Sequence, residues 1–209
     1  MKNKFFSLTF ILTIFFVMTL SAQESKSKDV EVPDNVVFGD LKFLKSEKII
    51  NTEFVYDSMG VGKMTENEYI MQKVTELNNS QSGKGDKWLV DWNDRKKFNY
   101  PVAFMESFNK KLMKSGLVAE KNASAAKYTM VVKTLYFEAG FYLLGLDIAE
   151  ASKVILEILF FESNNRSLPI ATIFLVPASG GGGAPAMAYG AAGKIAGKYL
   201  VQNVFQNNK

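Results

Sequence analysis

The segment from Asp86 to Arg95 carries both tryptophans of the chain among several acidic residues. Two carboxylates on one surface can serve as general acid and base when their surroundings separate their pKa values, and tryptophan rings can stack on sugar rings. This pattern predicts a carbohydrate-binding or carbohydrate-active module, whose candidate ligand-binding residues are Trp88, Asp91, Trp92 and Asp94. The alternative is structural: the acids make ion pairs and caps, and the tryptophans pin a loop to the core.

The 209-residue chain contains neither histidine nor cysteine. This composition excludes Ser-His-Asp and Cys-His catalysis, imidazole or thiolate zinc sites and dithiol redox chemistry. Carboxylate, lysine, tyrosine and serine chemistry remain. We therefore nominate no catalytic, cofactor-binding or metal-binding residue, expect no cofactor, and favour a non-catalytic protein over an enzyme.

Two glycine patterns invite a functional interpretation. The run from Gly180 to Gly183 precedes a helix, but it lacks both the Gly-Lys-Ser/Thr ending and the Gly-x-Gly-x-x-Gly register of phosphate-binding loops, so we interpret it as a connector. The Gly193-x-x-x-Gly197 spacing resembles a membrane dimer motif, yet Lys194 and Lys198 interrupt it. Tight packing within the protein is the expected role.

The segment from Gly140 to Leu146 is apolar where a hairpin loop should be polar. Such a tip could enter a membrane, cap a ligand cavity or dock on a partner. The candidate contact residues for an envelope protein or a lipid surface are Phe141, Tyr142, Leu143, Leu144 and Leu146. Alternatively, the segment is an extended strand or a loop folded back over the core.

The elements that would position these residues begin with a strand over 48–57, which is rich in β-branched and aromatic residues. Thr65 and Glu68 have the spacing of a capping box, and the apolar residues Ile70, Val74 and Leu77 then recur at helical spacing. The segment 83–99 reads as a connection rich in glycine, lysine and aspartate. Pro101 then predicts the start of a second helix.

Three apolar segments follow, at 128–137, 151–161 and 168–176, and the short turns between them predict an antiparallel meander. The tail over 185–205 predicts a helix with one small, apolar face. Hydrophobic residues on both faces of the middle strands indicate a buried sheet. The expected fold class is α+β: an antiparallel meander of three to four strands packed against helices, mainly on one face, with a C-terminal small-residue helix.

The N-terminus has the pattern of a secretory signal: Lys2 and Lys4, an apolar run from Phe5 to Leu20, and small residues up to Ala22. The run is shorter than the roughly 20 residues that span a bilayer. We expect cleavage near Ala22, a periplasmic or secreted protein, and no lipoprotein, since no cysteine can carry a lipid. The domain prediction is a signal peptide over 1–22, a flexible leader over 23–35 and a single α+β domain over 36–209.

The formal net charge of +4 is too small for a nucleic-acid-binding signature. Basic residues outnumber acids between Lys84 and Lys127. The basic residues of this segment could form a patch for an anionic lipid or glycan. The simpler interpretation is a solvated surface of helices and a loop.

Four stretches, over 39–45, 61–70, 83–88 and 108–110, resemble a family of uncharacterised exported proteins from Bacteroidetes. The resemblance covers most of the chain after the signal and implies export, without implying an activity or site residues. The element order is more loosely similar to periplasmic accessory domains associated with cell-envelope assembly. Together these features predict an exported, non-catalytic binding or accessory protein of the cell envelope.

Overall fold

The computed structural model describes residues 36–143, 148–180 and 184–206. The predicted signal peptide over 1–22 and the predicted leader over 23–35 lie outside the described residues. None of the helices in the described ranges is long and apolar enough to cross a membrane.

The strands are β1 (Val36–Gly39), β2 (Ile49–Val55), β3 (Gly60–Val61), β4 (Met64–Thr65), β5 (Val118–Glu120), β6 (Tyr128–Glu138), β7 (Phe141–Leu143), β8 (Ile148–Glu150), β9 (Ser152–Glu162) and β10 (Ala171–Gly180). The helices are α1 (Glu66–Ser80), α2 (Lys84–Asp94), α3 (Tyr100–Leu112) and α4 (Pro185–Leu200). A short 3₁₀ helix, η1 (Lys42–Ser46), and two π-helical segments, η2 (Arg95–Asn99) and η4 (Val201–Phe205), complete the helical elements.

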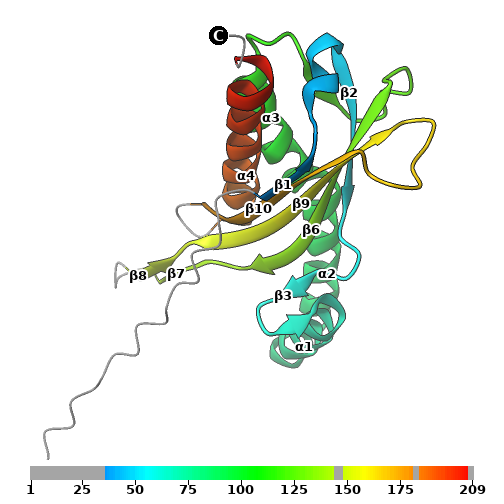
Figure 1. Cartoon of the computed structure of the whole chain (residues 1–209). Coiled ribbons are helices and arrows are strands. Elements are labelled where there is room, and N and C mark those ends of the chain that lie inside the picture. Colours follow the sequence, from blue (N-terminus) through cyan, green and yellow to red (C-terminus); the bar gives the residue numbers. More distant parts are fainter. Residues whose placement is uncertain (1–35, 144–147, 181–183, 207–209) are drawn as a thin grey trace, which may run out of the picture. The chain divides into compact units, whose positions relative to one another are not determined.

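The α+β fold class is confirmed, and β6, β9 and β10 form the expected antiparallel meander (Figure 1). The prediction of only three to four antiparallel strands is wrong, because the main sheet contains eight strands among the described residues and is mixed. Its order is β1-β10-β9-β6-β2-β5, with β2 parallel to β6 and to β5. The chain crosses over through helices between β2 and β6, so β6 enters the sheet parallel to β2. The two- to four-residue strands are too short to show alternation in sequence.

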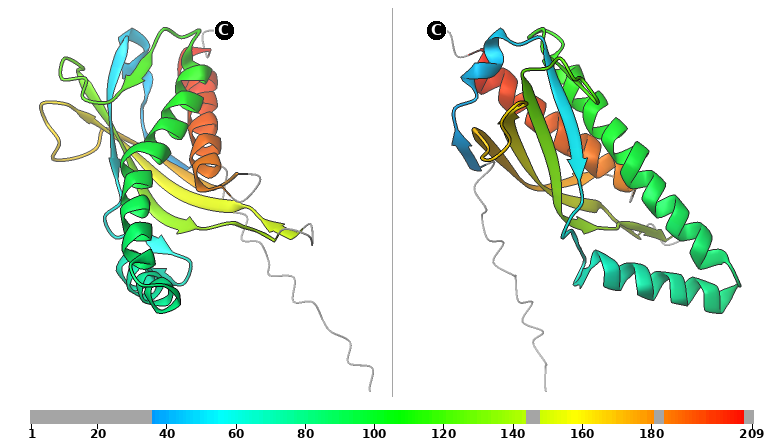
Figure 2. Two further views of the ribbon diagram at one scale, coloured as in Figure 1. Left: turned by 180° about the vertical axis from the view of Figure 1, so that it is seen from behind. Right: turned by 90° about the vertical axis from the view of Figure 1, so that its right-hand side faces the viewer.

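The prediction that residues 83–99 form a connection is also wrong, because this segment is largely helical. Gly85, which suggested a loop, allows α2 to approach α1: a Cβ there would lie 2.3 Å from the carbonyl oxygen of Val74. The capping box at Thr65 and Glu68 is confirmed at the start of α1. Helices α2 and α3 are joined directly through η2, so Pro101 lies inside a continuous helical segment rather than at its beginning (Figure 2).

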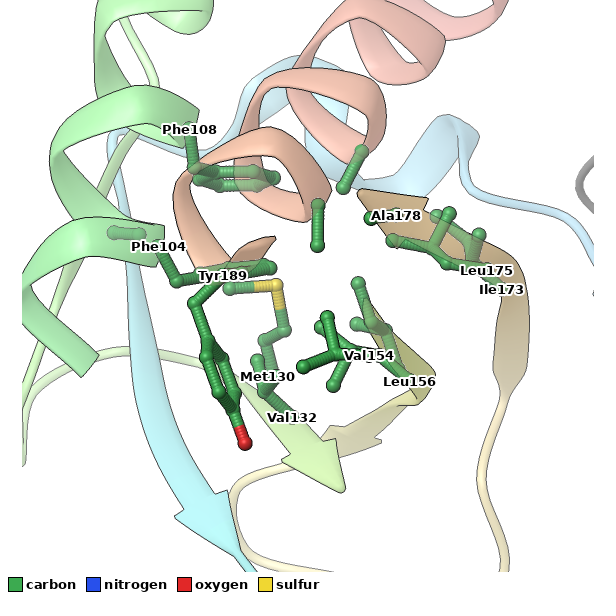
Figure 3. Close-up of a cluster of buried hydrophobic side chains, with 14 of the residues drawn as sticks. Phe104, Phe108, Met130, Val132, Val154, Leu156, Ile173, Leu175, Ala178 and Tyr189 are labelled. Carbon is green, nitrogen blue, oxygen red and sulfur yellow. The ribbon is translucent and has the colours of Figure 1, made fainter. Parts of the chain in front are cut away.

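One face of the sheet packs on α3 and α4, as predicted (Figure 2). Strand β9 alternates without interruption, so that Val154, Leu156 and Ile158 are buried while the residues between them are half-buried. Figure 3 shows the side chains of this core gathered from β6, β9 and β10 under Phe104, Phe108 and Tyr189. Two helices on one face therefore leave the other face with mixed apolar and charged side chains.

Helix α4 approaches α3 through the glycines of the Gly193-x-x-x-Gly197 pattern. A Cβ at Gly193 would lie 2.2 Å from the carbonyl oxygen of Phe104, and one at Gly197 would lie 2.9 Å from that of Phe108. The prediction of tight packing within the protein is confirmed.

Candidate functional site

Four residues meet where the chain just after β2, the start of α1, the end of α2 and the start of η2 come together. Tyr56, Glu66, Trp92 and Lys96 form this group, which we name the junction cluster. Glu66 accepts hydrogen bonds from the Trp92 indole nitrogen, at 2.7 Å, and from the Lys96 ammonium group. The Glu66 and Lys96 side chains are 15% and 17% exposed, so this ion pair is largely shielded from water.

The backbone places Glu66 at the first residue of α1. Thr65 accepts from the backbone N–H of Glu68, and the Glu68 carboxylate accepts from that of Thr65 at 2.8 Å. This capping box sets where α1 begins. Because Glu66 follows the cap directly, its carboxylate is held facing α2 and η2.

Pro101 explains why Tyr56 bonds to the backbone of Lys96 in the junction cluster. Because proline has no backbone N–H, it cannot donate to the carbonyl one turn before it, which is Lys97 in an α-helix or Lys96 in a π-helix. The Tyr56 hydroxyl donates to the Lys96 carbonyl oxygen at 2.8 Å, and the Lys121 ammonium donates to that of Lys97 at 3.4 Å. Side chains distant in sequence thus satisfy carbonyl groups next to a helical proline.

Burial raises the pKa of Tyr56 well above its usual range. The phenol therefore stays protonated at neutral pH and acts as a hydrogen-bond donor. The Lys96 ammonium also lies 5.7 Å from the centre of the Tyr56 ring, within the range of a cation–π contact. These contacts lock η2 onto the end of β2.

Two grooves flank the junction cluster and share Tyr56 and Lys96. The larger, which we name the α1 groove, has a volume of about 860 Å³ and is lined by residues 56–60 and 62–68 together with Lys96. The smaller, which we name the β2 groove, has a volume of about 460 Å³. It is lined by residues 52–56, Asn93, Lys96, Lys97, Pro101, Lys121 and Asn122. Both volumes fall in the range of ligand-binding sites.

The structure places the four candidate carbohydrate-binding residues on α2 rather than on a loop. Trp88 and Trp92 stack with ring centres 5.5 Å apart, and Tyr69 contacts both rings. Trp92 also contacts Phe137 and is buried, so its ring faces are covered by other aromatic residues. This geometry leaves no open face on Trp92 for a sugar ring.

Asp91 and Asp94 are exposed on α2. In the described ranges neither carboxylate takes part in an ion pair, so the ion pairs expected for them are absent there. Across those same ranges no three acidic side chains come together in a group that could hold a metal ion.

The candidate contact residues over 141–146 are described only in part. Phe141, Tyr142 and Leu143 form β7, which pairs with β8 in a two-stranded antiparallel ribbon, so the alternative of an extended strand holds for these three. Leu144 and Leu146 lie outside the described residues. The role of the segment as a partner or membrane contact stays a prediction.

Sequence reasoning missed Tyr56, Glu66 and Lys96 as parts of one site. Glu66 and Lys96 are far apart in the chain, and neither belongs to a pattern with a chemical meaning. The useful signal was indirect: a proline within a helical stretch requires another donor for the preceding carbonyls.

No protein-family model matches the chain, and no curated protein matches it. Among solved structures, the chain is similar to the PelC dodecamer from Paraburkholderia phytofirmans, with 8% sequence identity and a TM-score of 0.42. The similarity covers 79% of this chain and 98% of the PelC chain. At this level of similarity, nothing follows about what this chain binds.

Proposed function

We propose that the chain is an exported, non-catalytic binding protein that acts as an accessory at the cell envelope, and that the α1 groove is its contact site. Export is supported by the charged, apolar and small-residue order of residues 1–22. The resemblance of four stretches to exported Bacteroidetes proteins supports the same compartment.

The observation that carries the binding role is the internal bonding of the junction cluster at the wall of the groove. Glu66 accepts hydrogen bonds from the side chains of Trp92 and Lys96, while the Tyr56 hydroxyl donates to the Lys96 carbonyl oxygen. Groups that are bonded to one another in this way hold the shape of a groove, and a preorganised groove binds without the cost of ordering its walls. A general acid or base would instead direct its proton-transferring atom at the ligand.

The rest of the α1 groove is polar. Asp57, Lys63 and Asn67 are exposed along it, and they present both charges and an amide. These groups fit a polar segment of a partner better than an apolar ligand, since each can exchange a bond to water for a bond to that partner.

Photo-crosslinking in the source cell tests the proposal. A photoreactive amino acid at Asn67 should give covalent adducts with an envelope component, whereas the same amino acid at Lys194, an exposed residue of α4 outside both grooves, should give none. Intact-mass measurement of the protein should find a mature chain that begins near Gln23. Equal labelling at both positions, or a chain that keeps residues 1–22, would contradict the proposal.

A further inference from the structure

The β2 groove contains an open strand edge. Strand β2 pairs with β6 over Asn51–Val55 on one side and with β5 over Ile49–Asn51 on the other. From Thr52 to Val55, no strand in the described part of the chain pairs with the side of β2 that faces away from β6. A strand edge of this kind is a ready template for another chain.

The neighbouring edge of β5 is closed by one side chain. Asn109 of α3 donates to the carbonyl oxygen of Ala119 at 2.9 Å and accepts from its N–H at 2.8 Å. The amide group therefore takes the place of a strand beside β5. On this side of the sheet, the open backbone is therefore the stretch of β2 that lines the β2 groove.

The rim of this groove is cationic. Lys97 and Lys121 are exposed, and neither forms an ion pair with a residue that the structure describes. The acid beside them, Glu53, is already engaged: Arg166 donates to its two carboxylate oxygens at 3.0 and 2.8 Å. The groove thus offers two positive charges to an incoming group.

Thr52 provides a second, independent sign of an incomplete site. Thr52 is one of the residues that line the groove, it is 1% exposed, and its buried hydroxyl has no hydrogen-bond partner among the described residues. A buried hydroxyl without a partner is unfavourable by about 1 to 3 kcal/mol, so a bound ligand that supplies a partner is favoured.

We propose that the β2 groove binds an extended, acidic peptide segment of a partner protein, which adds to β2 as a further strand in line with β5. The open stretch of four residues is about 13 Å long at 3.3 Å per residue, which suits a short strand. Main-chain hydrogen bonds to β2 supply affinity, and carboxylates of the peptide meet Lys97 and Lys121. The inference goes beyond the α1 groove and does not depend on it.

The test uses the full chain and three probes: a capped ten-residue peptide of alternating valine and aspartate, its counterpart with lysine in place of aspartate, and polygalacturonate as an acidic polysaccharide. The aspartate peptide should bind, and the backbone amides of Thr52–Val55 that face the groove should exchange hydrogen more slowly in the complex. The lysine peptide should bind about tenfold more weakly or not at all.

The matched variants are Lys97→Glu, at the groove, and Lys87→Glu, on an exposed position of α2 outside both grooves. Both variants change the net charge equally, so they differ only in whether the charge lies at the groove. Lys97→Glu should weaken binding of the aspartate peptide by about tenfold, and Lys87→Glu by less than about twofold. Three results would overturn the proposal: no binding of the aspartate peptide, binding without slower exchange at 52–55, or equally strong binding of polygalacturonate. The crosslinking at Asn67 reports only on the α1 groove. If that crosslinking fails, the peptide-binding test of the β2 groove can still be interpreted.

Discussion

Tyr100 lies in the middle of a buried row of aromatic rings. Its ring stacks on Tyr189 at a centroid distance of 4.5 Å and an interplanar angle of 6°, and its other neighbour is Phe137 at 6.1 Å. The two tyrosines differ in how their hydroxyl groups are satisfied. That of Tyr189 bonds to Thr134 at 3.0 Å, whereas that of Tyr100 has no partner within the described ranges.

At neutral pH, Tyr100→Phe should leave the free energy of unfolding unchanged or raise it by about 1 kcal/mol, because it removes an unpaired buried hydroxyl. Tyr189→Phe should lower it by about 1 kcal/mol, since it removes a paired hydroxyl and orphans Thr134. Urea denaturation of the two variants and the wild type measures both. If Tyr100→Phe destabilises as much as Tyr189→Phe, its hydroxyl has a partner, such as a buried water.

The same residue predicts an alkaline limit to stability. Burial raises the pKa of Tyr100 to about 12, whereas in the unfolded chain the phenol keeps its ordinary pKa of 10.0. Between these values the folded state holds a proton that the unfolded state has released, so stability should fall with rising pH by up to about 1.4 kcal/mol per pH unit for this group. The fall should be shallower in Tyr100→Phe, although burial also raises the pKa of Tyr56 and of Tyr189. Stability curves measured from pH 9 to pH 12 would show parallel slopes if this assignment is wrong.

At the scale of elements, the contact between α3 and α4 depends on small residues. Gly193 has no room for a Cβ against the backbone of Phe104, whereas a Cβ at Gly190, one turn earlier, would lie 3.3 Å from the Ser107 hydroxyl oxygen and 3.6 Å from the Ala103 carbonyl oxygen. A hydroxyl can rotate away, but a helix backbone cannot. The two glycines therefore differ in what an added methyl group would displace.

Gly193→Ala should lower the free energy of unfolding by about 3 kcal/mol, because the helices must separate and the gain in helix propensity is only about 1 kcal/mol. Gly190→Ala is the matched control, and we expect it to remain within about 1 kcal/mol of the wild type. Denaturant midpoints of the two variants decide the matter. A stabilising effect of Gly193→Ala would show that α4 lies farther from α3 than the structure places it.

For the whole molecule, the order of the strands makes α4 part of the core. The inner face of the meander buries Val154, Leu156, Ile173 and Leu175 completely, and α4 packs directly on β9 and β10. The last helix is thus required to keep these side chains away from water, even though it is added after every strand has been made.

A chain that ends at Gly180 should lose cooperative unfolding, bind hydrophobic dyes and aggregate, because it keeps the strands but exposes their inner face. A chain that ends at Phe205 keeps α4 and η4 and should melt close to the wild type. Thermal melts by near-UV circular dichroism compare the two. Cooperative unfolding of the shorter chain at the wild-type midpoint would show that α4 is peripheral.

The amino-acid sequence by itself determined the elements that carry a local signal. The capping box at Thr65 sets the start of α1, and small residues mark the packing face of α4. Each of these signals lies within about four residues along the chain, because capping and side-chain periodicity are short-range effects. For that reason the fold class and the antiparallel meander were predictable.

Only the tertiary structure decided the pairing and the candidate site. The parallel pairing of β2 with β6 depends on a crossover through three helices. The segment that contains Gly85 was expected to be a connection, but it is part of α2, and Gly85 there packs closely on the backbone of Val74. The junction cluster joins Tyr56, Glu66 and Lys96 through hydrogen bonds between distant segments. The Tyr56 contact forms because a proline in a helix leaves carbonyl groups that a nearby donor can satisfy, and the packing of the whole chain decides which donor comes near.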